Sequence, residues 1–137
     1  MSTALDLLFD LSLARTHLAR EVDHSLSQHG ISLADLAILR ELRAAPNRKL
    51  RRSELAHRLG ITPSGIARQV APLERIGLVD REPHERDARL ALVVLTETGS
   101  EVVDQALETA EHAADRALAA RWTGVERERL ARLVSRR

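Results

Sequence analysis

Residues 50–99 constrain the fold of this chain more than any other segment, because a helix–turn–helix pattern runs there directly into a hairpin pattern. The second helix of the first pattern starts at Thr62 and Pro63, a capping hydroxyl followed by a proline suited to the first helical position. Such helix pairs have a small residue where the helices approach, a glycine where the chain turns and a buried apolar residue in the second helix. Ala56, Gly60 and Ile66 occupy these positions. We therefore predict two short packed helices, over residues 53–59 and 62–77.

The hairpin pattern follows the second helix without a gap. Residues 78–82 and 90–95 have the composition of strands, and the polar connector 83–89 lies between them. A hairpin placed directly after such a helix is a wing. A helix shaped for a major groove, beside an arginine-tipped ribbon narrow enough for a minor groove, points to double-stranded DNA as the partner.

Amphipathic helices are predicted for most of the remaining chain. They cover residues 4–28, residues 32–42 after a Ser32 cap, a segment from a Thr96 cap to about Ala120, and a segment after a capping box at 123–126. At about 1.5 Å per residue the first helix is roughly 37 Å long, so its apolar stripe needs cover from a second chain.

We expect a mainly α fold with a small β-hairpin wing, in a single domain of residues 1–137. The winged helix–turn–helix lobe would occupy residues 31–95. Dimerisation helices would occupy residues 1–30 and 96–137, on either side of that lobe.

The formal net charge of +1 hides a basic centre. Residues 48–89 carry ten Arg and Lys against six Asp and Glu, whereas the segments on either side are slightly acidic. A local basic patch suits a protein that contacts phosphates in one place, and a solvated charged surface is the simpler alternative.

The absence of cysteine excludes disulfides and thiolate metal sites. Neither a long apolar run nor a signal-peptide pattern occurs, so we expect a cytoplasmic protein without membrane contact.

The order of elements and three sequence runs resemble the MarR family of winged-helix regulators. The runs are Leu-Glu-Arg-Ile-Gly-Leu-Val-Asp-Arg at 73–81, Asp-Ala-Arg at 87–89 and Leu-Thr-Glu-Thr-Gly at 95–99. The resemblance covers nearly the whole chain and implies a homodimer, built from the first and last helices, with two winged lobes on a pseudo-palindromic operator. It also implies a transcriptional regulator. We favour a repressor, because occluding a promoter requires only tight binding.

The predicted recognition helix has one buried and one outward face when its residues are placed at about 100° intervals. The buried face holds Ile66, Val70 and Leu73, and the outward face holds Ser64, Arg68, Ala71 and Arg75, flanked by Ala67. Arg68 is the main candidate for reading a base, because a guanidinium can bond O6 and N7 of guanine together; a phosphate clamp is the alternative. Thr62 and Ser64 can offer hydroxyls and helix amides to phosphate, and Arg75 suits a backbone contact.

Two residues of this helix depart from the family pattern. Ala67 replaces a usual threonine and leaves only a methyl group to contact thymine. Pro72 replaces a usual polar residue and removes the hydrogen bond to the carbonyl of Arg68, so we expect it to bend or loosen the helix.

In the wing, the resemblance implies that Asp87 orients Arg89 and that Arg89 reaches into or along the minor groove. A tethered carboxylate fixes a flexible cation, and narrow A·T grooves attract arginine. Ala88 stands where some relatives have a second basic residue, and Arg86 is a candidate substitute. A solvated turn held by a surface ion pair is the simpler alternative. Further candidate phosphate contacts are Arg81, Arg51 and Arg52.

The resemblance also implies a small-molecule effector, bound between the dimer helices and the winged lobe. Its candidate walls are His17, Arg20, His24, Leu36 and Arg40. Only two aromatic residues, Phe9 and Trp122, are present, so stacking with a planar ligand has little support. No cofactor is expected.

Two alternatives to this function remain open at the level of sequence. A metal-responsive regulator is one, because Glu21 with His24 and Glu108 with His112 have spacings that could bind zinc if their helix faces met. A winged helix that binds protein instead of DNA is the other, although its basic residues argue against it. No P-loop, dinucleotide-binding or metalloprotease motif occurs, so we expect no enzyme.

Overall fold

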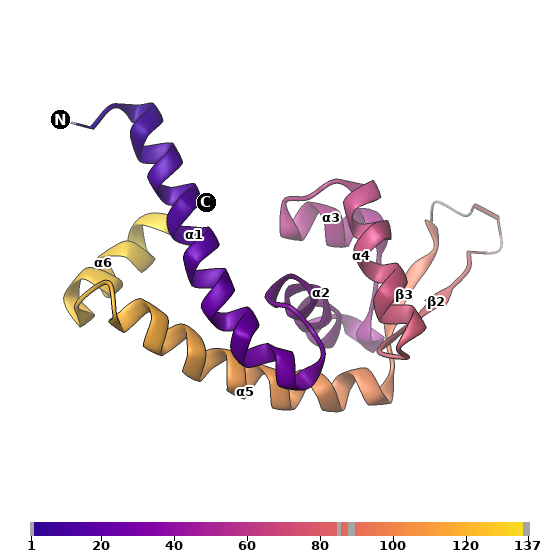
Figure 1. The fold of residues 1–137 in the computed structure, drawn as a ribbon. Helices are drawn as coiled ribbons and strands as arrows, with labels where there is room; N and C mark the ends of the chain where they lie inside the picture. The colour runs from indigo at the N-terminus through magenta and orange to yellow at the C-terminus, as the bar shows by residue number, and fades with distance from the viewer. Residues whose placement is uncertain (1, 85, 88–89, 136–137) are drawn as a thin grey trace.

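The molecule consists of two long helices, a lobe at one side of them and a shorter C-terminal helix (Figure 1). The computed structural model describes residues 2–84, 86–87 and 90–135. In chain order the elements are α1 (Ala4–Leu26), η1 (Ser27–His29), α2 (Leu33–Ala44), η2 (Pro46–Arg48), β1 (Lys49–Arg51), α3 (Arg52–Leu59), α4 (Pro63–Arg75), β2 (Val79–Glu82), β3 (Leu92–Leu95), α5 (Glu97–Ala119) and α6 (Gly124–Val134). Helices α1 and α5 pack against each other, and the lobe of α2, α3, α4 and the sheet lies on one side of them.

Hydroxyl caps fix where the principal helices begin. Thr3, Ser32 and Thr123 each form a capping box, in which the hydroxyl accepts an N–H three residues on and the acidic side chain there accepts the cap's own N–H. Thr62 and Thr96 cap α4 and α5 through the hydroxyl. The caps predicted at Ser32, Thr62, Thr96 and Thr123 are confirmed.

The sheet contains a strand that the sequence analysis missed. Strands are arranged in the order β1-β3-β2 and all pairs are antiparallel, with Lys49 opposite Val94 and Val79 opposite Leu95. The predicted hairpin was therefore incomplete, and its strands were predicted too long, because β2 begins at Val79 and β3 at Leu92. β1 has only three residues, too few for a recognisable alternation, and its partner lies far along the chain.

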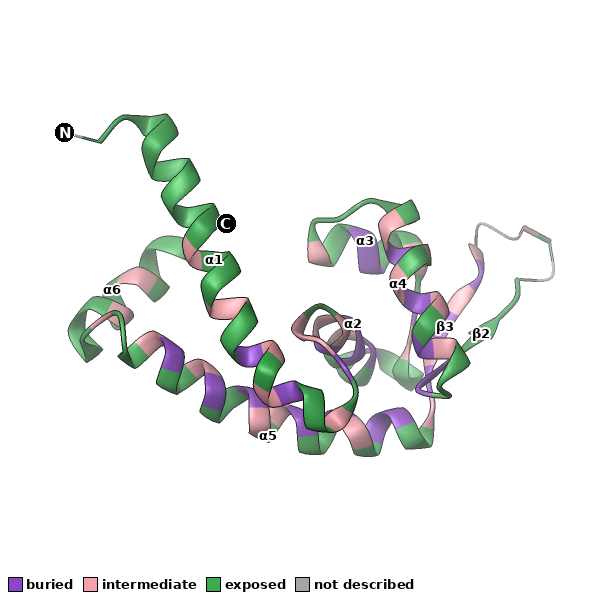
Figure 2. Ribbon diagram, in the orientation of Figure 1, coloured by how far each residue is buried: buried purple, intermediate pink, exposed green. Residues whose placement is uncertain are grey.

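The core lies in the lobe and along the inner side of α5 (Figure 2). Its largest fully buried side chains are Leu26, Ile38, Leu39, Leu42, Leu55, Ile66, Leu73, Val79, Val93 and Val103. The N-terminal half of α1 is different, because Leu5, Leu8 and Phe9 are each more than half exposed. Among the described residues, no helix combines the length and apolarity that crossing a membrane requires.

Polar contacts fasten the lobe to the long helices. The carboxylate of Asp23 on α1 accepts the backbone N–H of Leu33, at the first position of α2, across 2.7 Å. Arg43, near the end of α2, forms an ion pair with Asp104 on α5. The position of α2, against which the rest of the lobe packs, is thus tied to both long helices.

Candidate nucleic-acid interface

The turn between α3 and α4 has the geometry predicted from the sequence. Ala56 is buried on α3, and Gly60 ends that helix in the left-handed region with φ +66°, where a side chain would be strained. The backbone N–H of Ile61 donates to the Ala56 carbonyl, and Thr62 accepts the N–H of Gly65 at 3.0 Å. Helix α4 therefore starts in a fixed direction relative to α3.

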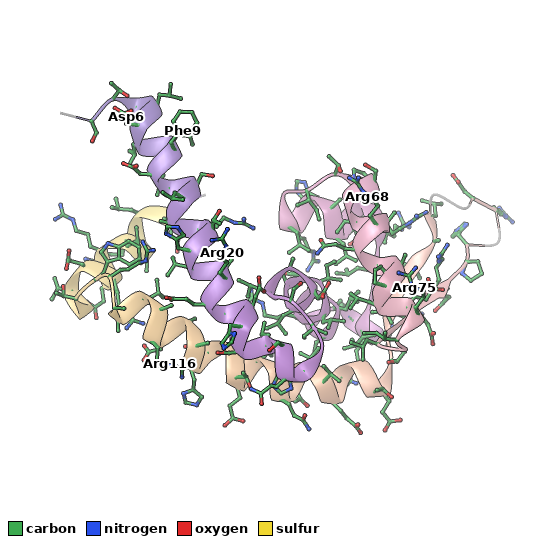
Figure 3. All side chains as sticks on the ribbon, viewed as in Figure 1. Asp6, Phe9, Arg20, Arg68, Arg75 and Arg116 are labelled. Carbon is green, nitrogen blue, oxygen red and sulfur yellow. The ribbon has the colours of Figure 1, made fainter. Side chains whose placement is uncertain are left out.

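Helix α4 is buried on one face and open on the other, as expected. Ile66, Val70 and Leu73 are at most 4% exposed, and they anchor α4 to the rest of the lobe. Arg68 and Arg75 are exposed, and Figure 3 shows both on the outer part of the lobe. Neither forms a hydrogen bond or ion pair with another described residue through its side chain, so both guanidinium groups are free to bind an anion.

The remaining candidates on α4 surround these arginines. Thr62 and Ser64 are exposed at the N-terminus of α4, where their hydroxyl oxygens lie 3.2 Å apart. Ala67 is half-buried beside Arg68. At the start of α4, the two hydroxyls and the backbone N–H of Ser64 can meet a phosphate oxygen. Pro63 has no N–H, and Thr62 already accepts the N–H groups of Gly65 and Ile66.

Helix α4 continues as a single helix through Pro72 to Arg75. Pro72 lacks an N–H and cannot bond the carbonyl of Arg68, but it lies one turn from the end of the helix. The backbone N–H of Ile76 still donates to the Pro72 carbonyl. The helix therefore presents Arg68 and Arg75 from one continuous element.

The base of the wing is tied to α4 by an ion pair that the sequence analysis did not predict. Arg81 of β2 donates from Nη2 to Oε2 of Glu74 at 2.9 Å. Lys49 of β1 likewise pairs with Glu82 of β2 at 3.2 Å, across the surface of β3. Arg81, which we predicted as a phosphate contact, is half-exposed and already has a carboxylate partner.

Part of the wing tip lies outside the described residues, including Ala88 and the predicted minor-groove probe Arg89. The prediction that Asp87 orients Arg89 therefore stays a prediction. Arg86 is exposed, and Asp87 is half-buried. His84, which we had not singled out, accepts the backbone N–H groups of Arg86 and Asp87 at its Nδ1, at 3.2 and 3.3 Å.

The candidate effector residues do not converge on one site. Leu36 and Arg40 line an apolar groove of about 470 Å³ between α1, α2, α5 and α6. Arg20 and His24 line a different groove, on the side of α1 that faces α5. His17 lines neither, and its Nδ1 accepts a hydrogen bond from Arg121 at 3.0 Å.

The histidines considered for zinc do come together. His24 and His112 line one groove, but Arg116 lies beside them. Among the described residues there is no group of three His, Cys, Asp or Glu side chains placed to hold a metal ion.

A helix–turn–helix pair followed by a β-hairpin defines the class of winged helix–turn–helix proteins. The chain belongs to the MarR family of that class. The family profile described as MarR family matches residues 29–90. The most informative solved relative is a MarR family transcriptional regulator from Streptomyces coelicolor in complex with DNA, with 31% identity, a TM-score of 0.81, and coverage of 98% of this chain and 86% of that one.

Two curated relatives agree with this assignment. An HTH-type transcriptional regulator of Mycobacterium leprae is 38% identical over 97 residues, which are 71% of this chain and 66% of the relative. The HTH-type transcriptional repressor YetL of Bacillus subtilis is 32% identical over 100 residues, which are 73% of this chain and 58% of YetL. The matched region thus spans about two thirds or less of each relative's length.

Proposed function

We propose that this chain is a homodimeric, sequence-specific DNA-binding transcriptional regulator that acts as a repressor and is released by a small-molecule ligand. The function is one of binding, without catalysis. Since the relatives named above are bacterial regulators, we expect the protein to act in the cytoplasm, where the bacterial chromosome lies.

One observation carries the DNA-binding proposal. The outward face of α4 offers two guanidinium groups without partners among the described residues, while the opposite face is fixed by Ile66, Val70 and Leu73. Arg68 and Arg75 lie seven residues apart on that face, about 10 Å along the axis, which is close to the rise of three base pairs. A rigid helix with this spacing can contact bases and backbone in one major groove.

Each candidate residue has a distinct role in this proposal. Arg68 reads a base, and Ala67 offers a methyl contact to thymine. Thr62, Ser64 and Arg75 hold phosphates on either side of the reading turns. In the wing, Arg81 and Arg86 contact the backbone, and Asp87 orients Arg89 toward the minor groove.

The homodimer is supported by apolar surface that a monomer would leave in water. In the N-terminal half of α1, Leu5, Leu8 and Phe9 are 58%, 62% and 63% exposed, and on α6 Val125 and Val134 are 77% and 67% exposed. A helix that is apolar around most of its circumference is normally enclosed by other elements. We therefore place the dimerisation helices in residues 1–30 and 96–137 and the DNA-binding lobe in residues 31–95.

Repression and release by a ligand complete the proposal. YetL, a relative of similar sequence over this region, is named a repressor. The apolar groove beside Leu36 and Arg40 touches both the long helices and α2 of the lobe. A ligand there would shift the lobe relative to the dimer helices, provided that it binds one spacing of the two recognition helices more tightly than another.

Selection of bound sequences from random duplex DNA tests the proposal. The expected result is an inverted repeat whose half-sites are about one helical turn apart, because a two-fold dimer presents its two recognition helices in that way. Enrichment of no motif would contradict sequence-specific binding. Repeating the selection with candidate ligands then tests release, since an effector should lower the recovery of the same motif.

A further inference from the structure

A polar groove between the C-terminal part of α1 and the middle of α5 belongs neither to the reading face of α4 nor to the apolar groove beside Leu36. It has a volume of about 510 Å³, and its lining includes His24, Ser25, Thr109, His112 and Arg116. Every residue of the lining is polar, and none is a carboxylate. The groove is therefore rich in hydrogen-bond donors and carries positive charge.

The basic side chains of the groove have no partners among the described residues. The side chains of His24, His112 and Arg116 form no hydrogen bond or ion pair with any described residue. Thr109, by contrast, is already fixed by a 2.8 Å hydrogen bond to His29 and by donation to the carbonyl of Gln105. Three nitrogen-bearing side chains from two helices thus share one hollow with their donors unused.

The backbone below these side chains is closely packed. Ala113 and Ala117 of α5 are only 3% and 4% exposed where that helix meets α1. Small residues at these positions allow α1 and α5 to approach, which brings His24 of α1 to the same hollow as His112 and Arg116 of α5. A neighbouring hollow shares His24, Ser25 and Arg116 and adds Arg20, accompanied by Glu21.

This chemistry favours an anion over a metal ion. A guanidinium is always charged and repels a cation, whereas its fork of N–H groups matches the oxygens of phosphate or sulfate. The imidazole rings of His24 and His112 can each donate an N–H to the same oxyanion. The phosphate groups of bound DNA are a poor candidate for this anion. Arg116 lies on α5, away from Arg68 and Arg75 on the lobe (Figure 3).

We propose that the groove between α1 and α5 binds a small oxyanion, the phosphate or sulfate group of a small molecule, through Arg116, His24 and His112. The site is separate from the apolar groove beside Leu36 and from the reading face of α4. It would give the protein a second ligand class, one recognised by charge.

Titration with sodium sulfate, followed by NMR of the histidine ring signals, tests the site. Sulfate is a suitable probe because its charge is constant around neutral pH, and sodium chloride at equal ionic strength serves as the control. The expected result is a saturable shift of the His24 and His112 signals with sulfate only. Arg116→Gln should weaken the apparent affinity by about tenfold or more, since one charge-assisted interaction is lost.

Matched variants separate this site from general charge effects and from DNA binding. Arg129→Gln removes an exposed arginine of α6 and should leave sulfate binding unchanged. Arg116→Gln should bind the selected operator as the parent does when sulfate is absent. The proposal is overturned if chloride reproduces the shifts, if Arg116→Gln retains full sulfate affinity, or if the two histidines instead bind zinc stoichiometrically.

Discussion

Glu74, in the last turn of α4, accepts a hydrogen bond from Arg81 of β2, with 2.9 Å between Oε2 and Nη2. The pair joins the recognition helix to the first strand of the wing. Because 54% of the Arg81 side chain is exposed, the pair adds at most about 1 kcal/mol to stability. The main effect of the pair is to hold the guanidinium of Arg81 in one place beside α4.

Glu74→Gln should increase the salt dependence of DNA binding. In the parent, Glu74 offsets part of the charge that Arg81 brings to the DNA backbone. Removing the carboxylate restores that charge, so the plot of log affinity against log salt should steepen by up to about one unit per lobe. Affinity for unrelated duplexes should also rise at low salt. Fluorescence anisotropy over a salt series measures both quantities. Glu128→Gln, on α6, is the matched control, and a slope unchanged in Glu74→Gln would place Arg81 out of reach of phosphate.

Arg68→Ala should lower operator affinity by roughly 1 to 3 kcal/mol and relax the preference at one base pair of each half-site. The reason is the loss of a guanidinium that can bond two acceptors on guanine. Mobility shifts with single-base operator variants at fixed salt measure the effect, with Arg129→Ala as a control for lost charge. Equal weakening on every sequence would instead make Arg68 a phosphate clamp.

Local signals explain how much of this molecule could be predicted from its sequence. Helix starts depend on a hydroxyl and the residues just after it, so Ser32, Thr96 and Thr123 could be read directly. The buried face of α4 follows from the helical period, which placed Ile66 and Leu73 inside. Such features involve residues only a few positions apart.

Contacts between distant elements could not be predicted in the same way. β1 exists because Lys49–Arg51 pairs with β3, and the Glu74–Arg81 pair depends on how the chain turns after α4. The candidate effector residues show the same limit. Spacing puts Arg20 and His24 on one stripe of α1, but it does not reveal that this stripe meets a different groove from Leu36.

Gly99→Ala should destabilise the protein by about 2 kcal/mol, because the first turn of α5 lies directly against the chain entering β2. A Cβ at this position would stand 2.1 Å from the Leu78 carbonyl oxygen and 2.8 Å from Cδ1 of Leu95. Moving α5 away would also strain the bond from the Thr96 hydroxyl to the Gly77 carbonyl, now 2.7 Å. Denaturant unfolding measures the change.

Gly124→Ala is the control for that substitution. Nothing lies within 4 Å of a Cβ built at Gly124, which starts α6. Alanine should therefore be neutral there or stabilise by up to about 1 kcal/mol, since it restricts the unfolded chain and favours helix. Equal destabilisation by both alanines would show that the close approach at Gly99 is not the cause.

Glu126→Gln should flatten the dependence of stability on acid pH. Hydrogen bonding to the backbone N–H of Thr123, and after it to the Thr123 side chain, holds the pKa of Glu126 below its ordinary value. A carboxylate with a lowered folded pKa stabilises fully above its unfolded pKa, and this stabilisation is lost as the pH falls through the folded value. Glutamine keeps an acceptor oxygen for the cap but does not titrate.

The unfolding midpoints of the parent and of Glu126→Gln, measured from about pH 6 downward, test the contribution of the capping box. The parent should lose more stability than Glu126→Gln over this range. Glu128→Gln removes the same charge from α6 without touching the capping box, so its profile should follow the parent. If Glu128→Gln flattens the profile as much as Glu126→Gln, net charge and not the Thr123 cap is responsible.

Phe9→Glu should convert the proposed dimer to a monomer. Phe9 is 63% exposed in the single chain, as are its neighbours Leu5 and Leu8 to similar extents, so in the proposed dimer the partner would cover it. A two-fold interface contains each residue twice, so losing about 2 kcal/mol per phenylalanine raises the dissociation constant by roughly a thousandfold. Sedimentation velocity over a concentration series measures this directly, while circular dichroism verifies that the helices persist.

Ile76→Glu, at a position 57% exposed beside the recognition helix, is the control and should remain dimeric. A Phe9→Glu protein that sediments as Ile76→Glu does would place the dimer interface away from the N-terminal half of α1.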